Sequence, residues 1–92
     1  MKKYMLENIE YELIENYKDG FDYEETKNKF TDYFYDYDYI IGDWAYGKLR
    51  LKGFYNSNHK SCTKINDFLN HQDYIKNHCA YECKYFILHK IN

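Results

Sequence analysis

The stretch from residue 39 to residue 55, YIIGDWAYGKLRLKGFY, decides how the middle of this chain folds. In its second half, cationic residues alternate strictly with leucines. This alternation is typical of a strand with one buried side, and it points the cations away from the core. We therefore predict two strands, residues 37–43 and 48–55, joined through the loop WAYG.

The same kind of pattern predicts two further strands. Residues 8–17, NIEYELIENY, place apolar side chains on one side and glutamates on the other, which is the period of a half-buried strand. Residues 83–91, CKYFILHKI, leave no clearly polar side. Strands that are apolar on both sides usually lie inside a sheet, so we expect this last strand to be an interior one.

Two helices are predicted between these strands. Asp22 is well placed to cap a helix that begins near Tyr23. The segment TDYFYDYDY also alternates with the period of a strand, but a strand over residues 33–41 would leave a helix of only about ten residues, which is marginal on its own. We therefore place the end of this helix near Asp36. A second helix is predicted after Thr63, where apolar residues recur at helical spacing, with a bend or break near His71.

The order strand, helix, strand, strand, helix, strand predicts an α+β fold. We expect residues 1–92 to form one small domain, with a mostly antiparallel sheet of about four strands and two helices. Aromatic residues make up 22% of the chain, so much of the core must come from rings. The absence of proline and the near-normal hydrophobic content argue against a disordered chain.

Charge and cysteine content favour a cytoplasmic protein that does not enter a membrane. Glu7 and Glu10 interrupt any apolar stretch that could serve as a signal peptide, and no segment approaches the length of a membrane span. Three cysteines, an odd number, fit a reducing compartment better than a disulfide scaffold. The net charge of −2 lacks the strong basicity that nucleic-acid binders often carry.

Several motifs resemble the YutD-like family, which comprises small cytoplasmic proteins of low-GC Gram-positive bacteria and their wall-less relatives. The resemblance spans residues 11–88 and is most specific in the segments NYKDGF (16–21), YDYIIGDW (37–44), LRLKGF (49–54) and the C-x3-C pair before Tyr85-Phe86. The resemblance implies an α+β domain. It implies no activity, because no biochemical role is established for the family.

The loop Gly42-Asp43-Trp44 is the first candidate site. A carboxylate and an indole at the end of a strand could hold a ligand between them, since binding pockets combine apolar and polar walls. Alternatively, Asp43 caps the hairpin loop through backbone N–H groups while Trp44 packs on the core. We favour the second interpretation, because aspartate plays this part in turns routinely.

The cations Lys48, Arg50 and Lys52 form a basic row, with Tyr46 nearby. Cations interleaved with aromatic rings on a sheet suit single-stranded RNA, because phosphates contact the cations and bases stack on the rings. Lysines also serve simply as the solvated face of an antiparallel strand. The net acidity of the chain favours that simpler interpretation.

The pair Cys79 and Cys83 suggests a metal site, because its spacing suits a zinc ligand pair. A second ligand pair would have to come from His59 and Cys62 or from His71. Because Cys83 leads into an apolar strand, we instead expect it to be a small buried residue. We therefore predict no metal and no cofactor.

The candidates support three hypotheses for function. The first is a non-catalytic binding or adaptor module that meets a protein or RNA partner through Trp44, Tyr46 and the basic row. The second is a small-molecule or enzymatic site around Asp43 and Trp44, although no catalytic motif occurs. The third is association of the chain with itself through exposed aromatic residues.

Overall fold

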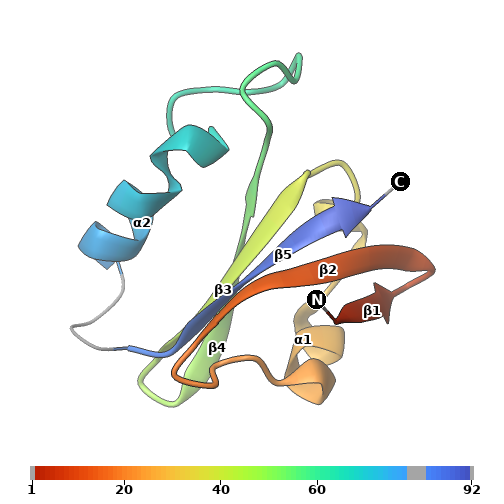
Figure 1. Ribbon diagram of the computed structural model, residues 1–92, viewed down its shortest axis with the longest axis vertical. Helices are drawn as coiled ribbons and strands as arrows, with labels where there is room; N and C mark the ends of the chain where they lie inside the picture. Colours follow the sequence, from red (N-terminus) through yellow and green to blue (C-terminus); the bar gives the residue numbers. More distant parts are fainter. Residues whose placement is uncertain (1, 79–82, 92) are drawn as a thin grey trace.

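The computed structural model describes residues 2–78 and 83–91, which form a five-stranded antiparallel sheet with helices on both faces (Figure 1). The strands lie in the order β1-β2-β5-β3-β4. In chain order the elements are β1 (Lys3–Leu6), β2 (Ile9–Tyr17), α1 (Tyr23–Lys29), the 3₁₀ helix η1 (Asp32–Phe34), β3 (Tyr39–Ala45), β4 (Lys48–Phe54), the 3₁₀ helix η2 (Phe68–Asn70), α2 (His71–His78) and β5 (Tyr85–Ile91). The α+β class and the antiparallel sheet predicted from the sequence are confirmed.

The last strand lies in the middle of the sheet, as its two apolar sides predict. It pairs antiparallel with β2 on one side and with β3 on the other. Phe86, Ile87 and Leu88 are all buried, although neighbouring residues in a strand point to opposite faces. Both faces of β5 are therefore covered.

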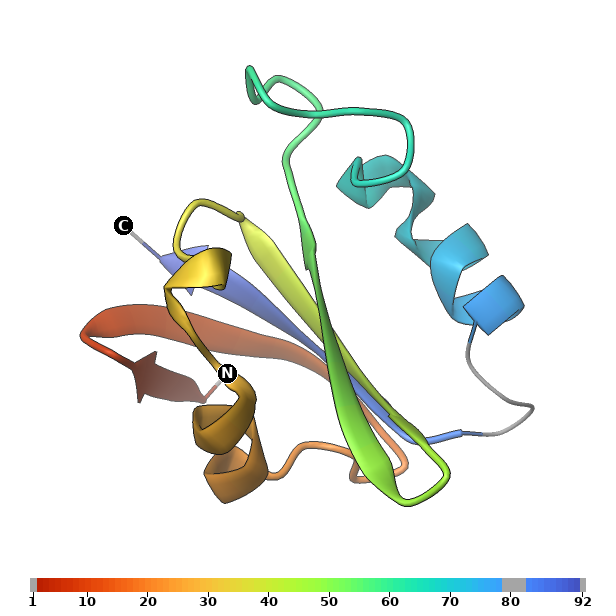
Figure 2. The same cartoon turned by 180° about the vertical axis from the view of Figure 1, so that it is seen from behind.

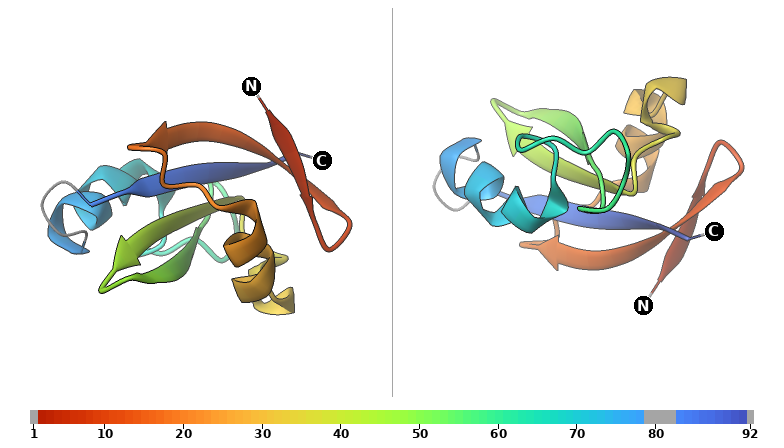
Figure 3. Two further views of the ribbon diagram at one scale, coloured as in Figure 1. Left: turned by 90° about the horizontal axis from the view of Figure 1, so that it is seen from below. Right: turned by 90° about the horizontal axis from the view of Figure 1, so that it is seen from above.

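The sheet separates the core into two layers, and helices cover the sheet on both faces (Figure 3). On the α1 side, the buried cluster comprises Leu6, Tyr11, Phe30, Phe34, Ile40, Leu49, Phe86 and Leu88. On the α2 side, it comprises Ile41, Phe54 and Ile87, with Phe68, Tyr74 and Ile75 packed against them. The α1 layer is the larger of the two, so most of the buried apolar surface lies there.

The fifth strand, β1, is absent from the sequence prediction. Its four residues pair antiparallel with β2 across the turn Glu7-Asn8, where both residues have positive φ angles of 49° and 72°. Two consecutive positive φ angles define a tight type I′ turn. The segment KYML is too short and too mixed in polarity for its alternation to stand out, so only its pairing reveals it as a strand.

The first helix begins where predicted but ends earlier. Asp22 caps it by accepting a hydrogen bond from the Glu25 N–H at 3.1 Å. The helix ends at Lys29 instead of Asp36, because Phe30 is extended and Thr31 starts η1 by accepting from the Tyr33 N–H. β3 consequently begins at Tyr39 and not at residue 37.

The second helix begins later than predicted. Thr63 does not cap it; Asp67 instead caps η2 by accepting from the Leu69 N–H at 3.0 Å. The 3₁₀ helix passes into α2 at His71, where the sequence predicts a bend or break. No helix in the described part of the chain is long and apolar enough to cross a membrane.

Two glycines in the β3–β4 hairpin lie beneath aromatic rings. A Cβ atom on Gly42 would collide with the ring of Phe86, its partner in β5. A Cβ atom on Gly53 would collide with the ring of Tyr37. Glycine is required at both positions because only a hydrogen leaves room for the ring.

Candidate functional site

The β3–β4 hairpin turns at Tyr46 and Gly47, as the view from behind shows (Figure 2). The φ angles of these residues are 54° and 75°, which again defines a type I′ turn. The turn is shorter than the predicted loop WAYG, because Trp44 and Ala45 belong to β3. Asp43 therefore lies inside β3 and not, as predicted, at the end of the strand beside the loop.

Asp43 and Trp44 point to opposite faces of the sheet. The side chain of Trp44 packs against the α1-side core, and its indole N–H donates to the Gly20 carbonyl at 2.7 Å. The Nζ of Lys84 lies 4.9 Å from the centre of the indole ring. Because neighbouring strand residues alternate between faces, the carboxylate and the indole are not brought together around one ligand.

Asp43 forms an ion pair with Arg50, which lies directly opposite in β4. The Asp43 carboxylate is buried, whereas the Arg50 side chain is 47% exposed. The hydrogen bond and the negative charge of Asp43 raise the pKa of Arg50. The predicted cap of the turn is not formed, because one carboxylate oxygen binds Arg50 and the other has no partner among the described residues.

The members of the basic row lie in three different environments. Lys48 is exposed beside the turn, and Arg50 is engaged by Asp43. Lys52 is half-buried, with its Nζ 4.9 Å from the ring centre of Phe54 and 5.9 Å from that of Tyr74. The row is therefore not a uniform cationic strip, since one charge is compensated and another is partly covered by α2.

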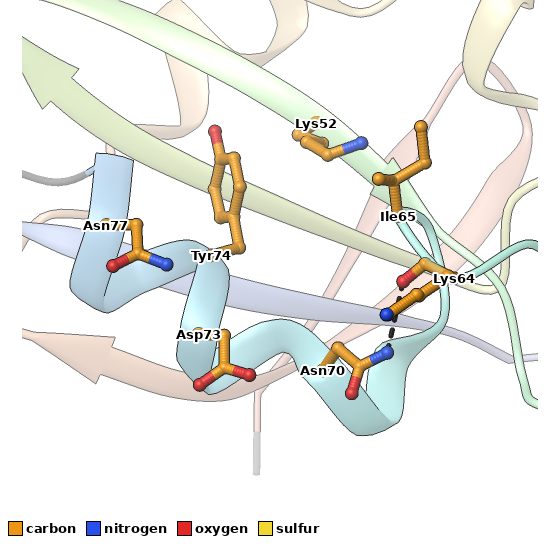
Figure 4. A pocket seen from close by; sticks show the side chains of 7 residues that line it. All are labelled: Lys52, Lys64, Ile65, Asn70, Asp73, Tyr74 and Asn77. Atoms are coloured by element: carbon orange, nitrogen blue, oxygen red, sulfur yellow. Dashed lines mark hydrogen bonds between the residues drawn. The ribbon is translucent and has the colours of Figure 1, made fainter.

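A pocket of about 560 Å³ adjoins Lys52 on the α2 side of the sheet (Figure 4). Its lining comes from β4, from the segment before η2, from η2 itself and from α2, and comprises Lys52, Lys64, Ile65, Asn70, Asp73, Tyr74 and Asn77. Sequence reasoning named only Lys52 as a site residue. The others carry no motif, because they meet β4 only through the packing of α2, η2 and the segment before η2.

The cysteines do not assemble a metal site in the described part of the chain. Cys79 lies outside the described residues. Cys83 is half-buried and disulfide-bonded, so the prediction of a small buried residue there is wrong. Cys62 is a free thiol. Within residues 2–78 and 83–91, no three His, Cys, Asp or Glu side chains are grouped to hold a metal ion.

Comparisons with known proteins agree on one family. The family model described as "Putative antitoxin YutD-like" matches residues 5–89. The "Putative antitoxin YutD" of Bacillus subtilis (strain 168) is 41% identical over 87 residues, which cover 95% of this chain and 96% of that protein. The solution NMR structure of YutD from B. subtilis, which is 39% identical, superposes with a TM-score of 0.83 over 100% of this chain and 84% of that one. The chain therefore belongs to the YutD-like family.

Proposed function

We propose that this chain is a non-catalytic binding module that docks on a protein partner through the end of the β3–β4 hairpin. This docking surface consists of Tyr46, Lys48 and Arg50. The B. subtilis relative is described as "Putative antitoxin YutD". That description supports binding to another macromolecule over catalysis of a reaction.

The observation that carries the proposal is the conformation and exposure of Tyr46. It occupies the first position of a type I′ turn, where a positive φ angle favours Gly, Asn or Asp. A bulky side chain at such a position costs about 1 kcal/mol of folding free energy. The ring is fully exposed, so it recovers none of that cost by packing. A tyrosine exposed at a hairpin tip is well suited to anchor a partner.

The charges beside Tyr46 favour an acidic protein surface as the partner. Lys48 is exposed, and the buried carboxylate of Asp43 holds the guanidinium of Arg50 in a fixed orientation. A fixed guanidinium loses less freedom on binding, which raises affinity. RNA is less well supported, because the pairing of Arg50 and the partial burial of Lys52 leave Lys48 as the one fully available cation of the row.

The test is purification of the tagged chain from its native cells, with and without ribonuclease, followed by mass spectrometry of the bound proteins. Tyr46→Asn is the informative variant, because asparagine suits the turn and removes only the ring. Leu69→Asn is the matched control, since Leu69 is an exposed apolar residue on η2, outside the docking surface.

We expect one defined protein to bind the parent chain and Leu69→Asn, in the presence of ribonuclease, and to be lost with Tyr46→Asn. Retention of that protein by Tyr46→Asn would overturn the docking surface. Loss of all partners on ribonuclease treatment would instead identify an RNA-dependent interaction and overturn the proposed protein partner.

A further inference from the structure

The pocket beside Lys52 lies outside the docking surface, and its walls come from β4, α2, η2 and the segment before η2. Lys52 projects from β4, while Asp73, Tyr74 and Asn77 come from α2 (Figure 4). The side-chain amide of Asn70 donates to the Lys64 carbonyl at 3.0 Å, which ties the segment carrying Lys64 to η2. The volume of about 560 Å³ falls within the range of small-molecule sites in proteins.

Two cations line the pocket, and they come from different parts of the chain. Lys52 is partly buried between aromatic rings, and Lys64 approaches from the segment before η2. Neither forms an ion pair with a carboxylate among residues 2–78 and 83–91. Asp73 supplies the single carboxylate of the lining. The lining therefore carries one net positive charge and suits a ligand with one negative charge.

The remaining walls suit a flat or apolar ligand body. Ile65 is 79% exposed at the pocket and contributes an aliphatic surface. The ring of Tyr74 stands between α2 and β4 and offers an aromatic surface. Asn70 and Asn77 add amide groups that accept or donate hydrogen bonds at the edge.

We infer that this pocket binds a small monoanionic carboxylate attached to a ring. The carboxylate lies between Lys52 and Lys64, and the ring lies against Tyr74 and Ile65. This site is independent of the docking surface, so either assignment can fail without the other. It also differs from the site expected around Asp43 and Trp44, neither of which lines the pocket.

The experiment titrates the full chain with phenylacetate and records amide ¹H–¹⁵N NMR spectra at constant pH. Phenylacetamide, a neutral ligand of nearly the same shape, is the matched probe. Saturable shifts are expected in β4 and in residues 64–77, with half-saturation on the order of 1 mM for a ligand of about ten non-hydrogen atoms. Phenylacetamide should require at least about tenfold more ligand.

Variants identify the cations that bind the carboxylate. Lys52→Gln and Lys64→Gln should each weaken phenylacetate binding about tenfold, because each removes one charge-assisted hydrogen bond. Lys60→Gln removes an exposed cation that does not line the pocket, and should bind like the parent chain. Because Lys64 lies outside every helix and strand, Lys64→Gln provides a folded variant even if Lys52→Gln is unstable.

Three results would overturn the inference. The first is the absence of saturable shifts in the parent chain with phenylacetate. The second is equal binding of phenylacetamide and phenylacetate, which would mean that the cations do not select the charge. The third is unchanged binding by folded Lys64→Gln.

Discussion

The carboxylate of Asp43 lies opposite Arg50 in the β3–β4 ladder, and the two side chains form an ion pair in which Asp43 is buried and Arg50 is exposed. Asp43 is shielded from water, while about half of the Arg50 side chain remains in contact with it. Removing the partner of a buried charge costs more than removing the partner of an exposed one. The two halves of this pair are therefore expected to respond differently to substitution.

Arg50→Gln is predicted to destabilise the protein by about 3 kcal/mol, because it leaves a buried carboxylate without its cation. Asp43→Asn should cost only about 1 kcal/mol, since water still solvates the guanidinium of Arg50. Urea unfolding followed by circular dichroism measures both values. Equal losses for the two variants would show that burial does not distinguish the partners.

Tyr11→Phe is predicted to stabilise the protein by about 1 kcal/mol. The Tyr11 hydroxyl is buried and has no hydrogen-bond partner among the described residues, so its desolvation is not compensated. Tyr23→Phe is the control, because the Tyr23 hydroxyl donates to the Met5 carbonyl at 2.6 Å and its loss should destabilise. A thermal melt of the three proteins tests the opposite signs of the two changes.

Stability is predicted to fall as the pH rises from about 10 to about 12. Burial raises the pKa of Tyr11 to about 12, and burial together with a hydrogen bond to Glu15 raises the pKa of Tyr85 to about 12. In the unfolded chain both phenols ionise near their ordinary pKa of 10.0. Above that pH the unfolded chain releases protons that the folded protein retains, so unfolding becomes easier.

The measurement compares tyrosinate absorbance with circular dichroism during alkaline titration. Tyr11→Phe should move the midpoint of alkaline unfolding to higher pH, because the raised pKa of Tyr11 no longer contributes to the loss of stability. An unchanged midpoint would mean that the ionisation of Tyr11 is not linked to unfolding.

Gly42→Ala is predicted to destabilise the protein by about 3 kcal/mol, because the added methyl group collides with the ring of Phe86. Gly47→Ala should cost about 1 kcal/mol, since its Cβ enters open space and only the positive φ angle of 75° is strained. The double variant Gly42→Ala/Phe86→Leu should recover part of the loss. Chemical denaturation of the parent chain and the three variants measures these free energies of unfolding. If the double variant recovers no stability, the collision with Phe86 is not the cause of the loss.

The sequence predicts best those features that neighbouring residues determine. Asp22 is correctly predicted as a helix cap because its carboxylate and the Glu25 N–H that donates to it lie only three residues apart in the sequence. The interior position of β5 follows from its composition alone. β1 is missed because its pairing with β2, and not its own pattern, makes it a strand.

In the candidate site, a small error in the predicted position of the turn changed which side chains were expected to meet. Placing the hairpin turn at WAYG instead of Tyr46-Gly47 put Asp43 at the end of its strand and Trp44 in the loop, where the two could share a ligand. Within a strand the two side chains face opposite ways. The pocket beside Lys52 depends on how α2 packs against β4, and no local pattern in the sequence encodes that contact.

The central position of β5 also bears on how the protein is made. During synthesis on the ribosome, the hairpins β1–β2 and β3–β4 emerge before the strand that joins them. Each isolated hairpin is marginally stable in water and exposes an unpaired edge. Folding is therefore completed after residues 85–91 have left the ribosome, and a nascent chain interrupted earlier would be an open substrate for cellular proteases.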